Sequence, residues 1–473
     1  METKQPNQPT ESVGRVVFLS SVAAIGGFLF GFDSGVINGT VDALQQAFDS
    51  DAVGTGFNVA SMLLGCATGA FFAGSMADKF GRRTVMIATA IAFVISAWGS
   101  GIASSSESFV LFRILGGLAV GGASIIAPAY ISEIAPPSIR GRLTSLQQLM
   151  IVIGLFCAFL SNYLIAGSAG GATLEHWGGF GAWQWMFWAE MIPATIYFLA
   201  LLFIPESPRY LVAAGRADEA ESVLASIMPF EKAKELVARI RETVLESRKP
   251  TLSDIFVKES RRVHPIIWVG VALSVLQQFT GINVVFYYGA VLWQSAGFTE
   301  SDALLTNVIN GSVNIAFTFV AIALIDRVGR KPLLLIGALG QAVMLGLLAI
   351  IFATGDLTPA GDLQLNETQG LWALLAANAY IAFFACTWGP IVWVLLGEMF
   401  PNRFRGAALA VCGLLHWLAN FSITLSFPIL LASIGLGPAY GIYAFFGLVA
   451  WFAVRTWVRE TKGLTLEEMS GEL

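Results

Sequence analysis

Apolar runs long enough to cross a lipid bilayer recur along this 473-residue chain, and they constrain its fold more than any other feature. A transmembrane helix needs about 20 mostly apolar residues, whereas the strands of a membrane barrel give alternating segments of about ten. Charged residues make up 12% of the chain, against about 25% in soluble domains. The sequence therefore predicts an all-α membrane protein with twelve transmembrane helices, near residues 16–38, 56–77, 84–104, 108–131, 145–166, 184–204, 264–294, 303–325, 332–353, 370–397, 407–431 and 438–458.

Lysine and arginine are distributed unevenly between the loops on the two sides of these helices. One set of loops is rich in them, with Lys79, Arg82 and Arg330 as examples, and both termini belong to this set. The opposite loops contain no Lys or Arg but carry acidic residues such as Asp42 and Glu300. Because positively charged loops stay in the cytoplasm, we expect a multi-pass protein of the cell (inner) membrane with both termini cytoplasmic.

Two charged motifs occur once in each half of the chain. The motif Glu133-x-x-Pro-x-x-x-Arg140-Gly recurs as Glu398-x-x-Pro-x-x-x-Arg405-Gly, and the loop that begins at Asp78 recurs at Asp326. Parallel six-helix repeats joined by a cytoplasmic segment are typical of rocker-type transporters. We therefore predict two six-helix bundles at 16–208 and 263–458, a linker of short amphipathic cytoplasmic helices at 209–262, and a cytoplasmic tail at 459–473.

The repeated motifs place opposite charges at the cytoplasmic ends of the helices. A solvated ion pair contributes only about 0–1 kcal/mol, so plain surface loops are the alternative to a functional role. The repetition in both halves favours a gate that holds the halves together when the cytoplasmic side is closed. The predicted gate residues are Asp78, Arg82, Arg83, Glu133, Arg140, Glu206, Arg209, Asp326, Arg330, Glu398, Arg405 and Glu460.

Two charged residues lie inside apolar segments. Asp33 is the only ionisable residue between Val16 and Gly39, and Arg113 lies within the run that begins near Phe109. A lone charge at membrane depth costs roughly 2.5–3.5 kcal/mol, so it normally has a partner or a function. Both residues lie about five positions from the outer ends of their helices, which is roughly 7–8 Å at 1.5 Å per residue. This matching depth predicts an ion pair; separate snorkelling to the outer surface is the alternative.

Several sequence motifs, taken in order along the chain, resemble the sugar porter branch of the major facilitator superfamily. They are Gly74-x-x-x-Asp78-Lys-Phe-Gly-Arg82-Arg83, Arg113-x-x-Gly-Gly, Pro205-Glu-Ser-Pro-Arg209, Gln277-Gln278-x-x-Gly-x-Asn283 and Gly389-Pro-x-x-Trp393. The resemblance extends over about residues 16–468 and implies the major facilitator fold, with two six-helix bundles. In proton-coupled members the aspartate at the position of Asp33 binds the proton, and the arginine at the position of Arg113 is its partner. Some facilitators keep this aspartate as well.

A sugar presents hydroxyl groups and an apolar ring face, so its site needs amide groups and aromatic walls. Polar residues cluster in the predicted seventh helix, where Gln278, Asn283 and Tyr287 lie roughly on one side. For a single amide, an interhelical hydrogen bond is the simpler explanation. Guided by the resemblance, we expect the sugar to contact Phe30, Gln148, Gln277, Gln278, Asn283, Tyr287, Asn314, Trp388, His416 and Trp417. His416 stands where relatives carry an amide, and it leaves the identity of the sugar open.

These features predict a proton-coupled importer of a monosaccharide, a pentose or hexose such as xylose or glucose, that works by alternating access as a monomer. A passive sugar facilitator is the alternative. The four cysteines all fall in apolar segments, which indicates buried small side chains rather than a disulfide or metal framework. The sequence shows no nucleophile–base pair, phosphate-binding loop or basic surface run, so we expect no enzyme activity, no cofactor, no metal and no nucleic-acid partner.

Overall fold

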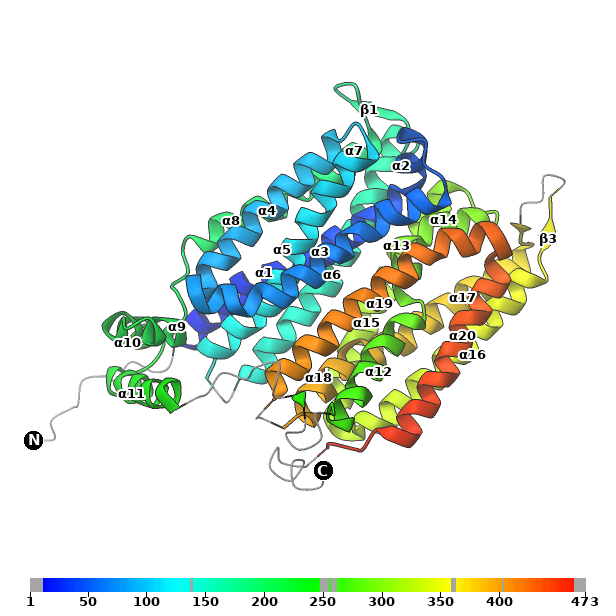
Figure 1. Cartoon of the computed structure of the whole chain (residues 1–473). Coiled ribbons are helices and arrows are strands. Elements are labelled where there is room, and N and C mark those ends of the chain that lie inside the picture. Colours follow the sequence, from blue (N-terminus) through cyan, green and yellow to red (C-terminus); the bar gives the residue numbers. More distant parts are fainter. Residues whose placement is uncertain are drawn as a thin grey trace, which may run out of the picture.

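The computed structural model describes residues 12–136, 139–246, 255–256, 262–358, 363–401 and 404–462. Parts of the predicted linker and most of the predicted tail lie outside these residues. Long apolar helices dominate the described chain and lie side by side, as the sequence predicted (Figure 1). Two short hairpins occur in loops between the helices and leave the all-α character of the fold unchanged.

The first half of the chain supplies six membrane-spanning segments, and the sixth of them is interrupted at Glu190. The sixth segment therefore consists of two short helices in place of one long helix. The elements are α1 (Val13–Val36), η1 (Ile37–Gly39), α2 (Val41–Ala47), α3 (Ala52–Phe80), α4 (Arg82–Ile102), α5 (Ser106–Ile134), α6 (Arg140–Ala169), β1 (Glu175–Trp177), β2 (Phe180–Gly181), α7 (Ala182–Ala189) and α8 (Met191–Leu201).

The second half repeats this arrangement, with two interrupted segments. The seventh segment is divided into three short helices, and the tenth contains a short π-helical stretch. The elements are α12 (Pro265–Phe279), α13 (Ile282–Tyr287), α14 (Gly289–Ser295), α15 (Glu300–Val328), α16 (Arg330–Ala353), β3 (Asp356–Leu357), β4 (Leu363–Gln364), α17 (Glu367–Phe383), η3 (Phe384–Trp388), α18 (Gly389–Met399), α19 (Arg405–Ile434) and α20 (Leu436–Trp457).

Among the described residues, 11 helical segments are long and apolar enough to cross a membrane. The twelfth segment is α7 with α8, which is apolar but broken at Glu190. The twelve predicted helices are thus present. Many large hydrophobic side chains on them are exposed, such as Ile192, Ile196 and Phe452, which fits helices that face lipid.

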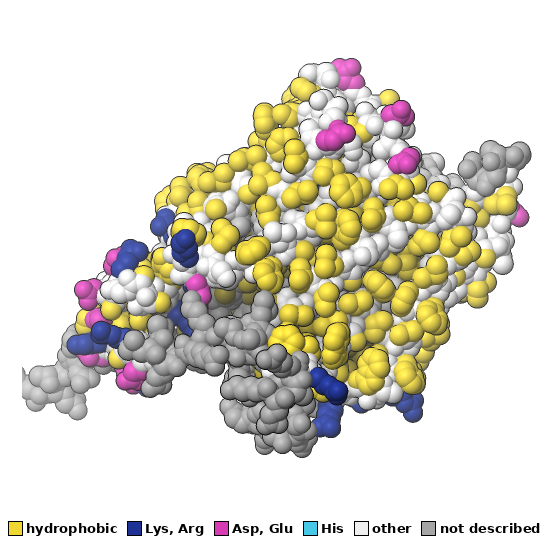
Figure 2. All heavy atoms as spheres, in the orientation of Figure 1, with side chains coloured by type: hydrophobic (Ala, Val, Ile, Leu, Met, Phe, Trp, Pro, Cys, Tyr) yellow, Lys and Arg dark blue, Asp and Glu magenta, His cyan; other side chains and the backbone are white. Residues whose placement is uncertain are grey.

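The two ends of the molecule differ in charge and in structure. We call the end where α1 begins and α20 ends the terminal face; α9 (Pro208–Ala213), α10 (Ala217–Ala225) and α11 (Phe230–Glu246) lie there (Figure 1). We call the opposite end, with α2 and the β1–β2 hairpin, the acidic face. Figure 2 shows a broad hydrophobic band between them on the side in view, with Lys and Arg towards the terminal face and acidic side chains at the acidic face.

The two halves meet along helices that run the length of the molecule. Helix α3 packs against α19, and α6 packs against α15, so each interface joins one helix of each half. Within the first half, α1 packs against α5 and α6. Helix α1 therefore lies next to the seam between the halves and is held by helices of its own half.

Small residues bring α3 and α5 close together. An added Cβ at Gly117 would collide with the carbonyl oxygen of Met62 and would lie 2.9 Å from Gly65 Cα. We expect Gly117→Ala to lower the free energy of unfolding by about 1–3 kcal/mol, because backbone atoms at this contact leave no room for a methyl group. Thermal unfolding of the detergent-purified protein measures this. Gly346→Ala is the matched control, since no atom lies within 4 Å of its Cβ position, and an equal loss in both variants would contradict the explanation.

Candidate functional site

A cavity lies between the two halves near the middle of the helices, with a volume of about 160 Å³. This is smaller than the roughly 300–1,000 Å³ of sites for drug-sized ligands, and it suits one small molecule. Helices α1 and α6 supply one side, and α12, α13, α15, η3, α18 and α19 supply the other. Nine of the ten residues predicted to contact a sugar line it: Phe30, Gln148, Gln277, Gln278, Asn283, Tyr287, Asn314, His416 and Trp417.

Amide groups of the seventh segment form a connected network at the cavity wall. Gln277 Nε2 donates to the carbonyl oxygen of Trp388 at 2.6 Å. Gln278 Nε2 lies 3.3 Å from Gln277 Oε1 and 3.3 Å from the His416 ring nitrogens, while Asn283 Nδ2 donates to Gln278 Oε1. Gln278 is therefore the centre of the network, and its contacts fix the side chains beside it. The network offers donors and acceptors in a buried site, which is what a polyhydroxylated ligand needs.

Aromatic side chains cover the apolar parts of the cavity. Phe30 of α1 and Trp417 of α19 face each other across the seam, with ring centroids 5.7 Å apart. Trp393 packs edge-on against His416 at 4.9 Å and also lines the cavity. Trp388, which we expected to contact the sugar, does not line the cavity. Its ring is buried, and Nε1 donates to the carbonyl oxygen of Leu334 at 2.9 Å. Trp388 packs between helices, and Trp393 occupies the cavity wall.

The interrupted helices explain how these side chains converge. In the seventh segment α12 ends before Gly281, which has φ = 81°, a left-handed conformation that glycine adopts without strain. The helix then restarts as α13 and turns Asn283 and Tyr287 into the cavity. In the tenth segment the π-helical stretch η3 precedes Gly389 and Pro390, both of which line the cavity. Such π-helical stretches often occur at functional sites.

Asp33 and Arg113 form the predicted ion pair. Arg113 Nη1 contacts Asp33 Oδ1, and both side chains are almost completely buried. The same guanidinium donates to the carbonyl oxygen of Asp33 at 3.2 Å, contacts Met62 Sδ, and lies 5.5 Å from the centre of the Phe187 ring. The pair thus joins α1 to α5 inside the first half. Ser34, next to Asp33 in the chain, lines the cavity and lies beside Tyr287.

A second carboxyl group, Glu190, lies beside this pair. Glu190 interrupts the sixth segment, is 1% exposed, and its side chain is close to Asp33. It is the only acidic or basic residue between Ala182 and Leu201. A single charge inside an apolar segment is the feature that identified Asp33, and it applies equally to Glu190, which the sequence prediction missed. With one arginine and two carboxyl groups, the buried cluster is electrically neutral only when it holds one proton.

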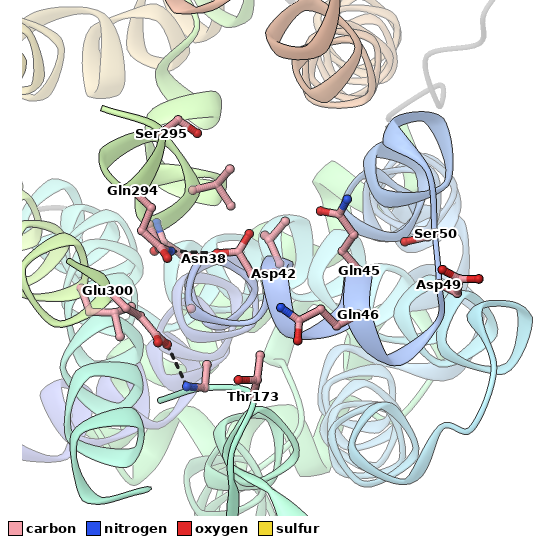
Figure 3. A pocket seen from close by; sticks show the side chains of 16 residues that line it. Asn38, Asp42, Gln45, Gln46, Asp49, Ser50, Thr173, Gln294, Ser295 and Glu300 are labelled. Carbon is pink, nitrogen blue, oxygen red and sulfur yellow. Dashed lines mark hydrogen bonds between the residues drawn. The ribbon is translucent and has the colours of Figure 1, made fainter. Parts of the chain in front are cut away.

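Among the described residues, four hydrogen bonds join the halves at the acidic face. Asn38 Nδ2 donates to the carbonyl oxygen of Phe286 at 2.9 Å, and Asn307 Nδ2 donates to Asn38 Oδ1 at 2.8 Å. Nearer the surface, Gln294 Nε2 donates to Asp42 Oδ2 at 2.8 Å. The backbone N–H of Ala172 donates to Glu300 Oε1 at 2.7 Å (Figure 3). The halves are therefore bridged at this face.

At the terminal face, the predicted gate residues form the same cluster in each half. Arg82 pairs with Asp78 and Glu133, both at 3.1 Å. Arg330 pairs with Asp326 at 3.1 Å and with Glu398 at 2.8 Å. These pairs join helices of one half. The gate that we predict for the conformation with a closed cytoplasmic side stays a prediction. The remaining basic gate residues have these positions: Arg83 donates to the carbonyl oxygens of Leu201 and Leu202, Arg140 to that of Ala135 and Arg405 to that of Phe400, while Arg209 is exposed.

Glutamates just after the last helix of each half complete these clusters. Glu206 accepts hydrogen bonds from the backbone N–H groups of Arg82 and Arg83, where α4 begins. Glu460 does the same for Arg330 and Lys331, where α16 begins. Burial raises the pKa of Glu460, but bonds from four backbone N–H groups outweigh it, and its pKa lies below the ordinary value. The carboxylate therefore stays ionised at the positive end of the helix.

Comparison with known proteins agrees with this architecture. A family model described as "Sugar (and other) transporter" matches residues 19–473. A glucose transport protein from Synechocystis sp. is 50% identical over 468 residues, which cover 99% of each chain. The D-xylose-proton symporter of Escherichia coli K12 is 38% identical over 483 residues, with 95% of this chain and 94% of the relative covered.

Solved structures of the E. coli xylose transporter XylE are similar as well. A structure in an inward open conformation has a TM-score of 0.82 at 36% identity, and it covers 97% of this chain and 99% of that chain. A structure of the proton:xylose symporter XylE bound to 6-bromo-6-deoxy-D-glucose has a TM-score of 0.77 at the same identity and coverage. The chain therefore belongs to the sugar porter family of the major facilitator superfamily, and it is a membrane transporter of sugars rather than an enzyme.

Proposed function

We propose that this protein is a proton-coupled monosaccharide importer that works by alternating access. The observation that carries this proposal is the buried cluster of Asp33, Arg113 and Glu190, which adjoins the cavity through Ser34. A buried cluster that is neutral with one proton provides a proton site, and the cavity provides a sugar site. Helix α1 carries residues of the proton site and of the sugar site, so a movement of α1 at one site displaces residues of the other.

In this mechanism the proton controls how firmly α1 is held. With Asp33 ionised, its charge pairs with Arg113 and ties α1 to α5. A proton on Asp33 weakens this pair, and Glu190 then remains as the carboxylate that faces Arg113. Helix α1 is thereby freer to move with the sugar bound beside Phe30 and Ser34. Coupling requires that the ligands bind the two conformations with different affinity, and this cluster supplies that difference.

We propose that the acidic face lies outside the cell and the terminal face in the cytoplasm. The support is the absence of Lys and Arg from every loop at the acidic face and their abundance at the other. The bacterial relatives favour the inner membrane as the location. A complete cavity within one chain favours a monomer as the functional unit. The charged clusters at the terminal face would then be cytoplasmic, and we propose that they fix the loops of each half as rigid units.

The cavity suits a hexose or a pentose, and His416 lines it at the position where the family resemblance implies an amide. A neutral imidazole has one donor and one acceptor in fixed positions, whereas an amide offers two donors and two acceptor sites. We expect His416→Gln to change the ratio of the KM values for glucose and xylose by about 3- to 10-fold, the effect of one hydrogen bond. Uptake of both labelled sugars measures this.

The control for this prediction is His176→Gln, since His176 lies on β1 at the acidic face, outside the cavity lining. A ratio of KM values that stays the same in His416→Gln would assign His416 to packing against Trp393 and Trp417.

The proposed function is tested by sugar uptake into proteoliposomes with an imposed pH gradient, acidic outside. We expect labelled glucose to accumulate above its external concentration, and an uncoupler that collapses the gradient should abolish the accumulation. A passive facilitator, which would use the same cavity, equilibrates the sugar and shows no response to the uncoupler. Equilibration alone would therefore contradict proton coupling.

A further inference from the structure

A second cavity, of about 690 Å³, opens at the acidic face between the two halves. Figure 3 shows polar side chains of α2 and α14 facing each other across it. Asp42 of α2 extends from the first half to Gln294 of the second, and Glu300 of α15 extends back to Ala172 of the first. A carboxyl group from each half therefore reaches across the seam, and both are brought together when this face closes.

The charges around Asp42 are all acidic except one histidine. Glu300 and Asp302 lie at the start of α15, and Asp49 lines the same cavity. Asp51 caps α3 through the N–H of Gly54, and Glu175 and His176 lie on β1, where His176 packs against Trp185. Helix α14 and residues 166–174 carry no charged side chain, and the loops of this face have no Lys or Arg. Closing the face thus brings Asp42 near another carboxylate without a compensating cation.

The two carboxyl groups have different partners. Glu300 accepts the backbone N–H of Ala172, a partner that can only donate. Asp42 meets the Gln294 amide, which donates to a carboxylate in one orientation and accepts from a carboxylic acid after a flip. Asp42 can therefore keep its bridge to Gln294 in both protonation states, and as a neutral acid it can donate to the amide oxygen as well.

We propose that Asp42 is a second proton-binding group of this transporter, at the acidic face, and that its protonation stabilises the conformation in which that face is closed. This rests on the proposed function in one respect, namely that the acidic face lies outside and opens during the cycle. External acidity then drives closure behind an incoming sugar, in the direction that import requires. Asp42 lies outside the cavity that we assign to the sugar. It therefore acts on the position of the two halves at the acidic face and does not contact the sugar.

The direction of the pH effect follows from the difference in the pKa of Asp42 between the closed and the open conformation. In the closed face, burial raises the pKa of Asp42, the Gln294 hydrogen bond lowers it, and the charge of Glu300 raises it; the net pKa lies above the ordinary value. When the face opens, Asp42 meets water and its pKa returns towards about 3.9. A proton then binds more tightly to the closed conformation. Relative to the open conformation, the closed conformation gains stability as the pH falls through the raised pKa of Asp42. The gain is complete when the pH lies below the ordinary pKa of an aspartate.

The test is a distance measurement between spin labels across the acidic face. Cysteines replace Val53 of α3 and Ser301 of α15, which are both exposed, in a background without the four native cysteines. The background also carries Asp33→Asn, so that titration of that residue does not contribute. In nanodiscs, we expect acidification from pH 7.5 to pH 5 to raise the population with the short distance. Asp42→Asn, which mimics the protonated carboxyl, should give this population at both pH values.

The matched control is Asp49→Asn, which removes an exposed carboxylate from the same cavity without touching the bridge to Gln294. We expect Asp42→Asn to change the ratio of closed to open populations at pH 7.5 by about fivefold or more, the lower end of typical coupling between linked sites, and Asp49→Asn to leave it unchanged. Equal effects of the two variants, or an undiminished pH response in Asp42→Asn, would overturn the proposal. This readout needs no transport, so its failure is distinct from a failure of sugar accumulation.

Discussion

Asp33→Asn is expected to abolish accumulation of sugar while exchange of sugar across the membrane persists. At one proton per sugar, each unit of pH gradient supplies about 1.36 kcal/mol, so a gradient of two units supports roughly 100-fold accumulation by the wild-type protein. The asparagine variant has no carboxyl group at this position, and its internal and external sugar concentrations should become equal. Labelled sugar uptake into proteoliposomes, with and without the gradient, measures both quantities.

Two features of the cluster make this variant informative. Arg113 keeps Glu190 as a neighbouring carboxylate, so the substitution does not leave a buried cation without a counter-charge, a defect that costs about 3–5 kcal/mol. The control is Asp49→Asn, an exposed aspartate at the acidic face. Full concentrative uptake by Asp33→Asn would exclude Asp33 as the coupling residue, and loss of accumulation in the control would show that the assay responds to charge alone.

Gln278→Ala is expected to raise the sugar concentration for half-maximal exchange by about tenfold to 100-fold. The substitution removes a side chain that faces the cavity, and it also removes the partner of Asn283 and His416. A buried polar group without its partner costs about 1–3 kcal/mol, and every 1.4 kcal/mol corresponds to a factor of ten in affinity. Equilibrium exchange of labelled sugar separates this effect from proton coupling.

The matched control is Gln341→Ala. Gln341 is a fully buried amide of α16, but it lies outside the cavity lining, and its side chain has no hydrogen-bond partner among the described residues. Its removal should leave the sugar affinity unchanged. Similar losses of affinity in the two variants would show that Gln278 acts through general packing and not through contact with the sugar.

Much of the fold was predictable because its signals are local in the sequence. Long apolar runs located the twelve membrane segments, and the repeated charged motifs gave matching clusters around Arg82 and Arg330. Asp33 and Arg113 were recognised as partners because the helix rise places them at equal depth. Glu190 is also a single charge in an apolar run, so the sequence alone contains the signal that would identify it.

Other features were not predictable from such patterns. Trp388 ends the π-helical stretch η3 and Trp393 follows it in α18. A π-helical turn shifts the register of the side chains that follow it, and no sequence period predicts such a turn. The gate residues pair within one half, and hydropathy carries no information about which of these side chains meet. The bridges of Asp42 and Glu300 join residues more than 120 positions apart, so only the folded chain reveals them.

The central claim is that the proton at the buried cluster moves together with the sugar. The most direct measurement is the external pH of a weakly buffered proteoliposome suspension, without any imposed gradient, when sugar is added. We predict that glucose or xylose makes the medium alkaline in the wild-type protein and leaves it unchanged with Asp33→Asn. Sugar entry into wild-type vesicles without a change in external pH would contradict the account and establish a facilitator.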